Sequence, residues 1–262
     1  MLPNVTFLGL YLYDICILIG VLVAFFLADR LVIKSGFSLK LQRLVIVAAF
    51  LAVVVGYGSA VLFQAFYNFL DTGVFSLRSG ATFYGGLIGG VAVYLLVWFI
   101  GGKKYCDDNE QITRFPEMLS IGACCVPLAH AFGRIGCLFA GCCHGQATDA
   151  WYGITMLTNE GWVKVVPVQI FEALFLFALS AVLIILFVKK PAWKLPLMSF
   201  YCGIYGIWRF VIEFFRGDER GKTIVSFLSP SQLTAVLLIL FAIGYLVFWI
   251  IKRKKMKKES AV

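Results

Sequence analysis

The stretch LVIVAAFLAVVVGYGSAVLFQAFYNF at residues 44–69 contains no charged residue, and it decides the class of fold. Apolar runs approaching about 20 residues are long enough to cross the hydrocarbon core of a bilayer as a helix. A barrel strand would instead show a short segment of alternating hydrophobicity. The whole composition agrees, because 61% of the 262 residues are hydrophobic and 14% are charged, whereas soluble domains are about 25% charged. The sequence excludes a soluble enzyme, a disordered chain and a nucleic-acid-binding protein, and it predicts an all-α integral membrane protein.

Six further apolar runs accompany this stretch, so we predict seven transmembrane helices in one membrane domain covering residues 1–262. The expected spans are about 10–28, 44–69, 83–100, 117–139, 168–188, 196–215 and 230–250. The segment before Leu10 carries no Lys or Arg, so a cleavable signal peptide with a basic start is not expected.

Lys and Arg residues are distributed unevenly between the two sets of connections. Sixteen of them belong to one set: Arg30, Lys34, Lys40, Arg43, Lys103, Lys104, Arg114, Lys189, Lys190, Lys194, Lys252, Arg253, Lys254, Lys255, Lys257 and Lys258. Five belong to the other: Arg78, Lys164, Arg216, Arg220 and Lys222. Because cytoplasmic loops carry the excess of Lys and Arg, the N-terminus is expected outside and the C-terminus in the cytoplasm. The basic tail then anchors the orientation and meets anionic lipid heads.

Arg134 and Arg209 are the two basic residues that remain inside apolar spans. A cation in hydrocarbon costs at least about 2.5–3.5 kcal/mol on insertion scales, so it usually faces protein or water. Glu213 follows Arg209 by four residues and shares its helical face, which favours a local ion pair. Arg134 has no acidic neighbour within one turn of its own span. Both arginines also lie near the outer end of their span, so their long side chains could snorkel to the membrane surface.

A second interpretation makes the two arginines an anion site. Guanidinium groups bind phosphate through paired hydrogen bonds, and the external leaflet supplies phospholipid head groups. The glycines near Arg134 in the sequence are Gly133, Gly136, Gly141 and Gly145. Small residues let helix backbones approach closely. The pair Gly85 and Gly86, at the start of a span, could present amide hydrogens to an anion.

Four of the eight cysteines and one of the two histidines lie in or beside apolar spans. Packing between helices is enough to explain these five residues. Cys16, Cys124, Cys125 and Cys202 are interpreted as packing residues, since free cysteine is commonly buried. His130 is interpreted as a residue of helix contacts.

Cys137, Cys142, Cys143 and His144 gather at the outer end of the fourth span. A disulfide there would suit an oxidising exterior. A metal site of the form Cys-x4-Cys-Cys-His is a second interpretation, although adjacent ligating cysteines depart from the usual knuckle spacing. A catalytic role is the third, with His144 as base or Cys142 as nucleophile, and a purely structural loop is the fourth.

Four short motifs follow one another along the chain. Residues 84–89 read YGGLIG, residues 133–145 read GRIGCLFAGCCHG, residues 167–172 read PVQIFE, and residues 205–216 include Tyr205, Gly206, Arg209, Glu213, Phe214 and Arg216. In these motifs the chain resembles the bacterial prolipoprotein diacylglyceryl transferases, whose patterns are His-Gly-Gly-Leu-Ile-Gly, Gly-Arg-x-Gly-Asn-Phe-x-Asn-x-Glu-x-x-Gly, Pro-x-Gln-x-x-Glu and Tyr-Gly-x-x-Arg…Glu-Phe-x-Arg. Seven spans with the N-terminus outside agree with that family.

The chain departs from the second pattern at both Asn positions, at the Phe and at the Glu, and from the first pattern at its histidine. Tyr84 stands at the histidine position, and Cys137 and Cys142 stand at the first Asn and the Glu. A phenol is a poorer base than an imidazole. His144 appears in a loop whose family signature has no histidine, so we expect His144 to act as the base and Tyr84 to hold lipid or acceptor by its hydroxyl.

The resemblance implies a bacterial inner-membrane enzyme that moves the diacylglyceryl group of phosphatidylglycerol to the lipobox cysteine of a prolipoprotein. It implies a site toward the external leaflet. We expect no cofactor and assign no metal ligand, while a metal at the loop of Cys137, Cys142, Cys143 and His144 stays an open interpretation. The expected catalytic residues are Arg134, Arg209, His144 and Tyr84. The expected substrate-binding residues are Gly85, Gly86, Gln169, Glu172, Tyr205, Glu213, Gly133, Gly145 and Cys142.

Two other classes of function stay open at this point. A family member with these replacements could use a different head group or acceptor. A non-catalytic lipid-binding or transport protein, or a thiol-redox membrane protein using the cysteines, would share the same spans. The absence of an evident inverted repeat argues against a transporter.

Overall fold

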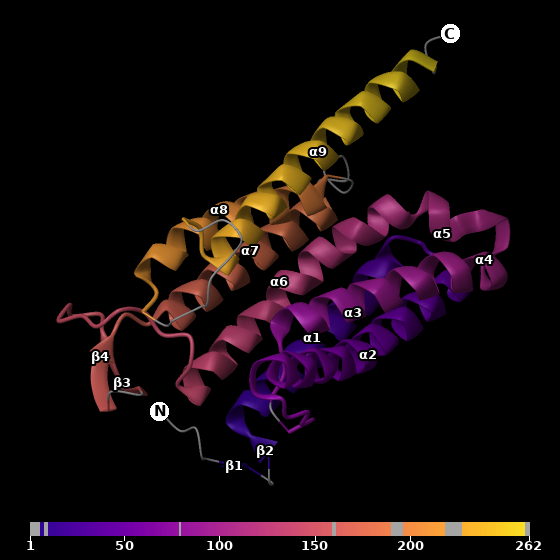
Figure 1. Cartoon of the computed structure of the whole chain (residues 1–262). Coiled ribbons are helices and arrows are strands. Elements are labelled where there is room, and N and C mark those ends of the chain that lie inside the picture. The colour runs from indigo at the N-terminus through magenta and orange to yellow at the C-terminus, as the bar shows by residue number, and fades with distance from the viewer. Residues whose placement is uncertain are drawn as a thin grey trace. The chain divides into compact units, whose positions relative to one another are not determined.

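The computed structural model describes residues 6–7, 10–78, 80–158, 161–189, 196–217 and 227–259 (Figure 1). Six helical runs among them are long and apolar enough to cross a membrane. They are α1 (Leu12–Lys34), α2 (Leu39–Thr72), the run Phe83–Tyr105, α6 (Phe115–Ala140), α7 (Val168–Lys189) and α9 (Pro230–Glu259). The prediction of a helical integral membrane protein is confirmed.

The third run is built from three pieces, α3 (Phe83–Leu96), the π-helical turn η1 (Val97–Gly101) and α4 (Gly102–Tyr105). Two short helical segments, η2 (Asp107–Asn109) and α5 (Glu110–Thr113), lead from it into α6. The expected seventh span at 196–215 corresponds to α8 (Leu197–Ile212) and the 3-10 turn η4 (Glu213–Phe215). Helix α8 is shorter than each of the six helical runs named above, because its regular hydrogen bonding ends at Ile212.

Contacts divide the chain into two compact units, one made of residues 29–116 and the other of residues 1–28 and 117–262. The single membrane domain expected from the sequence stays a prediction. In the unit 29–116, α2 and α3 lie side by side (Figure 1). Gly56 of α2 faces Gly86 and Gly90 of α3, and the Ser59 hydroxyl donates a 2.9 Å hydrogen bond to the Gly85 carbonyl. Small residues thus let the two backbones approach.

The other unit contains the start of α1 together with α6, α7, α8 and α9. Gly136 of α6 lies against Tyr13 and Cys16 of α1, where an added Cβ would come within 3.1 Å of the Tyr13 ring. The rings of Phe175 on α7 and Trp208 on α8 are stacked with centroids 4.2 Å apart. These contacts hold the helices that carry both membrane arginines.

A β-hairpin of β3 (Ile154–Thr158) and β4 (Gly161–Val165) occupies the connection between α6 and α7, and the sequence analysis did not predict it. A shorter strand pair, β1 (Thr6–Phe7) with β2 (Leu10–Tyr11), precedes α1. The chain ahead of the hairpin pairs with β4 and with the residue that follows η4, through the bridges Ala147↔Val165 and Gly145↔Arg216. These pairings fix the loop that contains His144.

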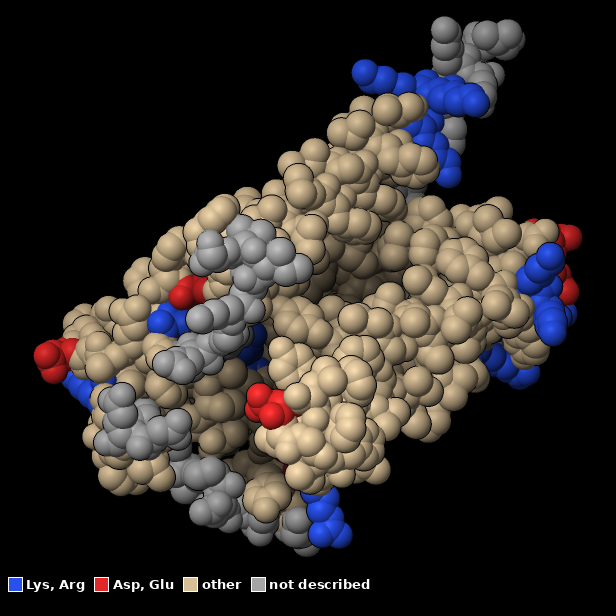
Figure 2. Space-filling view, viewed as in Figure 1, with Lys and Arg blue, Asp and Glu red and all other residues tan. Residues whose placement is uncertain are grey.

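Basic side chains concentrate at the C-terminal end of α9, where Figure 2 shows blue atoms beyond an apolar length of helix. The basic side chains described at this end of α9 are those of Lys252, Arg253, Lys254 and Lys255. Four residues that entered the positive-charge comparison lie outside the described residues: Lys190, Lys194, Arg220 and Lys222.

Close packing of α8 on α9 depends on Gly206. A Cβ at this position would lie 2.8 Å from Ile239 Cγ1 and 3.0 Å from the Ala235 carbonyl oxygen. Overpacking of this kind typically costs about 1–3 kcal/mol. We expect Gly206→Ala to lower the thermal unfolding midpoint of the purified protein in detergent.

Gly203 provides the matched control on the same helix. Its added Cβ would meet Ala242 Cβ at 3.5 Å, an ordinary contact distance. Gly203→Ala should therefore leave the midpoint nearly unchanged. Equal midpoints for the two variants would contradict the proposed role of Gly206.

Candidate functional site

Glu172 of α7 is a fully buried carboxylate at the centre of a polar cluster between helices. Arg134 of α6 forms an ion pair with it, at 3.0 Å between Nε and Oε2. The Tyr205 hydroxyl of α8 donates a 3.1 Å hydrogen bond to Oε1, and His130 Nε2 lies 4.0 Å from the same oxygen. The acid partner that Arg134 lacks in its own span thus comes from α7, in the motif that starts at Pro167.

Arg209 of α8 lies in a second polar cluster. Its Nη2 is 2.7 Å from Glu213 Oε2 and donates a 2.6 Å hydrogen bond to the Ser231 hydroxyl. The predicted ion pair between Arg209 and Glu213 is confirmed. Arg216 Nε lies 3.9 Å from the same Glu213 oxygen, so one carboxylate faces two guanidinium groups.

Ser229 links this cluster to the start of α9. Its hydroxyl donates a 2.7 Å hydrogen bond to Glu213 Oε1 and accepts one of 3.1 Å from the Gln232 amide. The Ser229 amide in turn donates to Gln232 Oε1 at 3.0 Å. This is a capping box with proline at the first helical position. Sequence analysis missed Ser229 and Ser231, although the pattern SPSQ at 229–232 is a readable helix-start signal.

The two clusters act on one another through charge. Arg134, Arg209 and Arg216 lie near enough to Glu172 for their charges to stabilise its carboxylate. The Arg209 Nη1 atom is buried and has no hydrogen-bond partner among the described residues. A buried guanidinium donor without a partner is costly, so this atom is suited to receive an anionic ligand.

The loop after α6 carries Cys142 and Cys143 and follows a helix end of the Schellman type. The Cys142 amide donates to the Cys137 carbonyl at 3.2 Å, the Gly141 amide donates to the Leu138 carbonyl at 3.3 Å, and Gly141 has a φ of 75°. This motif brings the residue at 142 next to the residue at 137. Cys143 has the unusual φ of 64°, which turns the chain again.

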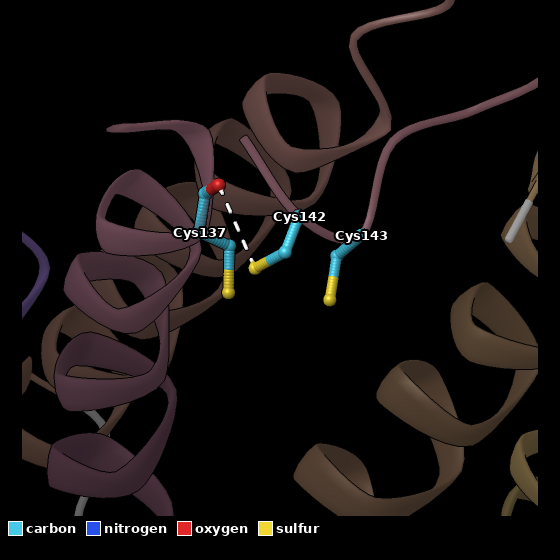
Figure 3. Close-up of side chains that lie close together, drawn as sticks. All are labelled: Cys137, Cys142 and Cys143. Atoms are coloured by element: carbon cyan, nitrogen blue, oxygen red, sulfur yellow. Dashed lines mark hydrogen bonds between the residues drawn. The ribbon is translucent and has the colours of Figure 1, made fainter. Parts of the chain in front are cut away.

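The result is a cluster of three thiols, whose sulfur atoms all lie within 4.8 Å of one another. Figure 3 shows Cys137 projecting from the helix and Cys142 and Cys143 from the loop, with the Cys142 sulfur 3.8 Å from the Cys137 carbonyl oxygen. The three residues carry thiols that are not joined by a disulfide. Hydrogen bonds from Cys137 and Cys142 lower the pKa of the Cys143 thiol against the effect of burial, and the nearby Arg216 guanidinium lowers it further.

His144 is partly buried in a loop held on both sides. Its carbonyl accepts a hydrogen bond of 3.3 Å from the Gly217 amide, and the Gln146 amide donates to the Phe215 carbonyl at 3.0 Å. Its ring Nδ1 lies 2.9 Å from the Gly145 carbonyl oxygen. Because a carbonyl only accepts, Nδ1 carries the proton in the neutral ring, and Nε2 keeps a lone pair for use as a base.

Gly145 and Gln169 hold this loop in place. A Cβ on Gly145 would lie 2.7 Å from the carbonyl oxygens of Val166 and Phe215. The buried Gln169 amide donates a 2.7 Å hydrogen bond to the Cys142 carbonyl, while its Oε1 has no partner among the described residues. Both residues therefore position the cysteine and histidine loop.

Tyr84, Gly85 and Gly86 belong to the unit 29–116. The Tyr84 side chain is 43% exposed, with its ring edge-on to Phe83. Gly85 packs against Phe63, and the Gly86 amide donates to the Thr82 carbonyl at 3.2 Å. The expectation that Gly86 offers its amide to an anion is therefore wrong, because the helix itself uses it. The expected role of Tyr84 in holding lipid or acceptor by its hydroxyl stays a prediction.

Gly133 and Gly136 both face α1. A Cβ on Gly133 would lie 3.5 Å from Ile17, which is an ordinary contact, whereas Gly136 is tightly packed. Gly136 therefore matters for helix approach, and Gly133 leaves room beside Arg134. A direct substrate contact for Gly133 stays a prediction.

We expect Glu213 to orient Arg209 and Arg216 rather than to exchange protons, because its carboxylate faces both guanidinium groups. Glu213→Gln keeps an oxygen that accepts from Ser229 but removes the charge that faces both guanidinium groups. We expect a partial loss of activity, about tenfold, which is the scale of one hydrogen bond to a charged group. The pH profile of the rate should keep its shape, and disappearance of an ionisation from that profile would contradict the orienting role. Glu110→Gln, in the other unit, serves as the control.

Together, the helices and buried clusters define a polytopic membrane protein with arginines held between its helices. The sequence comparisons specify this class further. A family model described as prolipoprotein diacylglyceryl transferase matches residues 2–249. The chain belongs to the prolipoprotein diacylglyceryl transferase family.

Similar proteins carry the same name in several bacteria. A phosphatidylglycerol–prolipoprotein diacylglyceryl transferase of Clostridium tetani is 32% identical over 255 residues, covering 95% of this chain and 96% of the relative. A protein named as the second such transferase of Clostridium perfringens is 34% identical over 187 residues, 70% of this chain and 66% of the relative. One from Campylobacter curvus is 31% identical over 75% of this chain and 66% of the relative.

Proposed function

We propose that this chain transfers the diacylglyceryl group of phosphatidylglycerol to the cysteine thiol of a prolipoprotein. The observation that carries this proposal is the pair of arginines within the helices, the mostly buried Arg134 and the buried Arg209, whose charges act on one buried carboxylate. The transferase names of relatives matching most of the chain support the reaction.

The chemistry follows from what the reaction requires. The acceptor sulfur attacks the glyceryl carbon that carries the phosphate ester, the carbon–oxygen bond breaks, and glycerol phosphate leaves with the electron pair. Arg134 and Arg209 stabilise the charge that grows on the leaving phosphate, in a site shielded from water. His144 takes the thiol proton through Nε2. Glu172, Glu213, Tyr205 and Gln169 position these groups.

The proposal includes a location and an orientation. We place the chain in the bacterial inner membrane with seven spans, counting α8 as the span at 196–215. The N-terminus is then outside, the C-terminus is cytoplasmic, and the site faces the external leaflet, where the signal-peptide region of a prolipoprotein arrives. The positive charge at the end of α9 supports this orientation.

One experiment tests the function. Purified protein is incubated with phosphatidylglycerol and a lipobox peptide, and mass spectrometry follows the peptide and the released glycerol phosphate. Diacylglyceryl peptide together with glycerol phosphate supports the proposal. If neither product forms and the protein still binds phosphatidylglycerol vesicles, the proposal fails and the chain is a non-catalytic lipid-binding protein.

A second candidate is transfer with a different head group or acceptor, favoured by Tyr84, Cys137 and Cys142 at positions where the family pattern has His, Asn and Glu. Repeating the assay with other anionic phospholipids and with a peptide of different sequence around its cysteine separates the two. Turnover confined to another lipid or peptide would replace the first proposal.

A further inference from the structure

The three thiols of Cys137, Cys142 and Cys143 have a geometry that fits a metal ion. Their sulfur atoms lie within 4.8 Å of one another, and Figure 3 shows them directed to the same side of the loop. In a tetrahedral zinc site with bonds of about 2.3 Å, sulfur atoms are about 3.8 Å apart. Small side-chain rotations close that difference, since Cys142 and Cys143 lie on a loop.

A metal ion would bind all three sulfur atoms of this cluster, whereas a disulfide would join only two of them. A disulfide joins two sulfurs at about 2.05 Å and leaves the third thiol beside it, and Cys142 and Cys143 are neighbours in the chain. Zinc binds all three as thiolates. Among the described residues, no further Cys, His, Asp or Glu belongs to the cluster. Three protein ligands and one open position are typical of catalytic rather than structural zinc sites.

Nearby cations balance the charge that such a site would carry. Zinc with three thiolates has one net negative charge, and a fourth thiolate adds another. Arg134 lies close enough to Cys137 and Cys143 to interact with their charges, and Arg216 interacts in the same way with Cys143. Arg134 and Cys137 are also three residues apart on one helical face. The cluster thus adjoins Arg134, one of the two arginines assigned to the leaving phosphate.

We propose that Cys137, Cys142 and Cys143 hold a zinc ion whose fourth position binds the acceptor thiol of the prolipoprotein and keeps it as a thiolate. This inference rests on the proposed function for the identity of the acceptor. A thiol bound to zinc is deprotonated. The metal therefore provides, in a chain with Tyr84 at the family's histidine position, the activation that a nucleophilic thiol needs.

The step balances without any oxidant. The acceptor thiol binds zinc and gives its proton to His144 and then to water. The thiolate sulfur forms a bond to the glyceryl carbon, and the carbon–oxygen bond to phosphate breaks with its electrons going to oxygen. The thioether product is a weak zinc ligand and leaves, so the three cysteine thiolates are unchanged at the end.

Metal content is the first measurement. The full-length protein is purified in detergent under reducing conditions, incubated with Zn²⁺, dialysed and analysed by elemental mass spectrometry. We expect one zinc ion per chain, lost in Cys137→Ser, Cys142→Ser and Cys143→Ser. Cys202→Ser is the matched control, since its buried sulfur contacts Met198 instead, and it should retain the ion. Thermal unfolding of each variant identifies any that fail to fold. Absence of stoichiometric zinc from the wild type would overturn the inference.

Cobalt substitution tests the open position without relying on turnover. Co²⁺ bound by thiolates gives sulfur-to-metal charge-transfer absorption that grows with each added thiolate. We expect a lipobox peptide to increase this absorption and a peptide with serine in place of cysteine to leave it unchanged. No response to the cysteine peptide would overturn the role in activation and leave a purely structural ion.

Activity measurements separate this inference from the proposed function. Since a free thiol is only a few per cent ionised at pH 7, removing zinc should slow transfer by up to roughly 30-fold. A cobalt response to the peptide with no transfer from phosphatidylglycerol would uphold the metal site and refute the proposed reaction. Full transfer activity in metal-free protein would refute the metal's role and uphold the reaction.

Discussion

Arg134→Lys and Arg209→Lys should each reduce turnover of phosphatidylglycerol by about 10²–10³-fold, the cost of removing one electrostatic stabiliser of a developing anion. Lysine keeps the charge but cannot supply the planar pair of donors. Arg134 already uses one edge for Glu172, and Arg209 uses one nitrogen for Glu213 and Ser231. The remaining N–H donors of each guanidinium group are available to the phosphate, and an ammonium group has no equivalent planar pair. Steady-state release of glycerol phosphate measures the effect.

Two observations would decide this prediction. Arg43→Lys, at an exposed position of the other unit, should keep wild-type turnover and controls for the substitution itself. Wild-type turnover in both Arg134→Lys and Arg209→Lys would make the arginines structural and end the phosphate-site proposal. Binding of phosphatidylglycerol vesicles should weaken along with turnover.

His144→Ala should cost at least about 10²-fold in rate, since general-base assistance is typically worth about 10²–10⁴-fold. The structure strengthens the reason, because the hydrogen bond from Nδ1 to the Gly145 carbonyl leaves Nε2 as the basic nitrogen. Tyr84→Phe, which removes only a hydroxyl, should cost less. Single-turnover transfer to the lipobox peptide measures the chemical step directly.

His144→Asn separates a base from a loop anchor. The asparagine amide can donate to the Gly145 carbonyl in place of Nδ1, but it has no basic nitrogen. If His144 is the base, the asparagine variant should be as slow as the alanine variant. An active His144→Asn or His144→Ala enzyme would contradict the assignment.

The order and approximate bounds of the long helices could be predicted from the sequence, because the bilayer requires long uninterrupted apolar runs. Six of the expected spans correspond to helices of suitable length, such as 168–188 and the observed Val168–Lys189. The pair Arg209 and Glu213 was predictable for a local reason, since residues four apart lie on the same face of a helix. The hairpin of β3 and β4 was not predicted. Its two short strands lie in the connection between α6 and α7, for which only the length and the charge were considered.

The sequence by itself determined that this protein is a helical membrane protein, which residues carry charge into its spans, and which family motifs it contains. Only the tertiary structure decided that Glu172 faces Arg134, that Ser231 and Ser229 hold Arg209 and Glu213, and that three cysteines converge. Part of that convergence is local, since Gly141 ends the helix in a motif that joins 137 to 142. The rest depends on which helix faces pack together, and in an apolar chain the hydrophobic pattern does not distinguish a face toward lipid from a face toward protein.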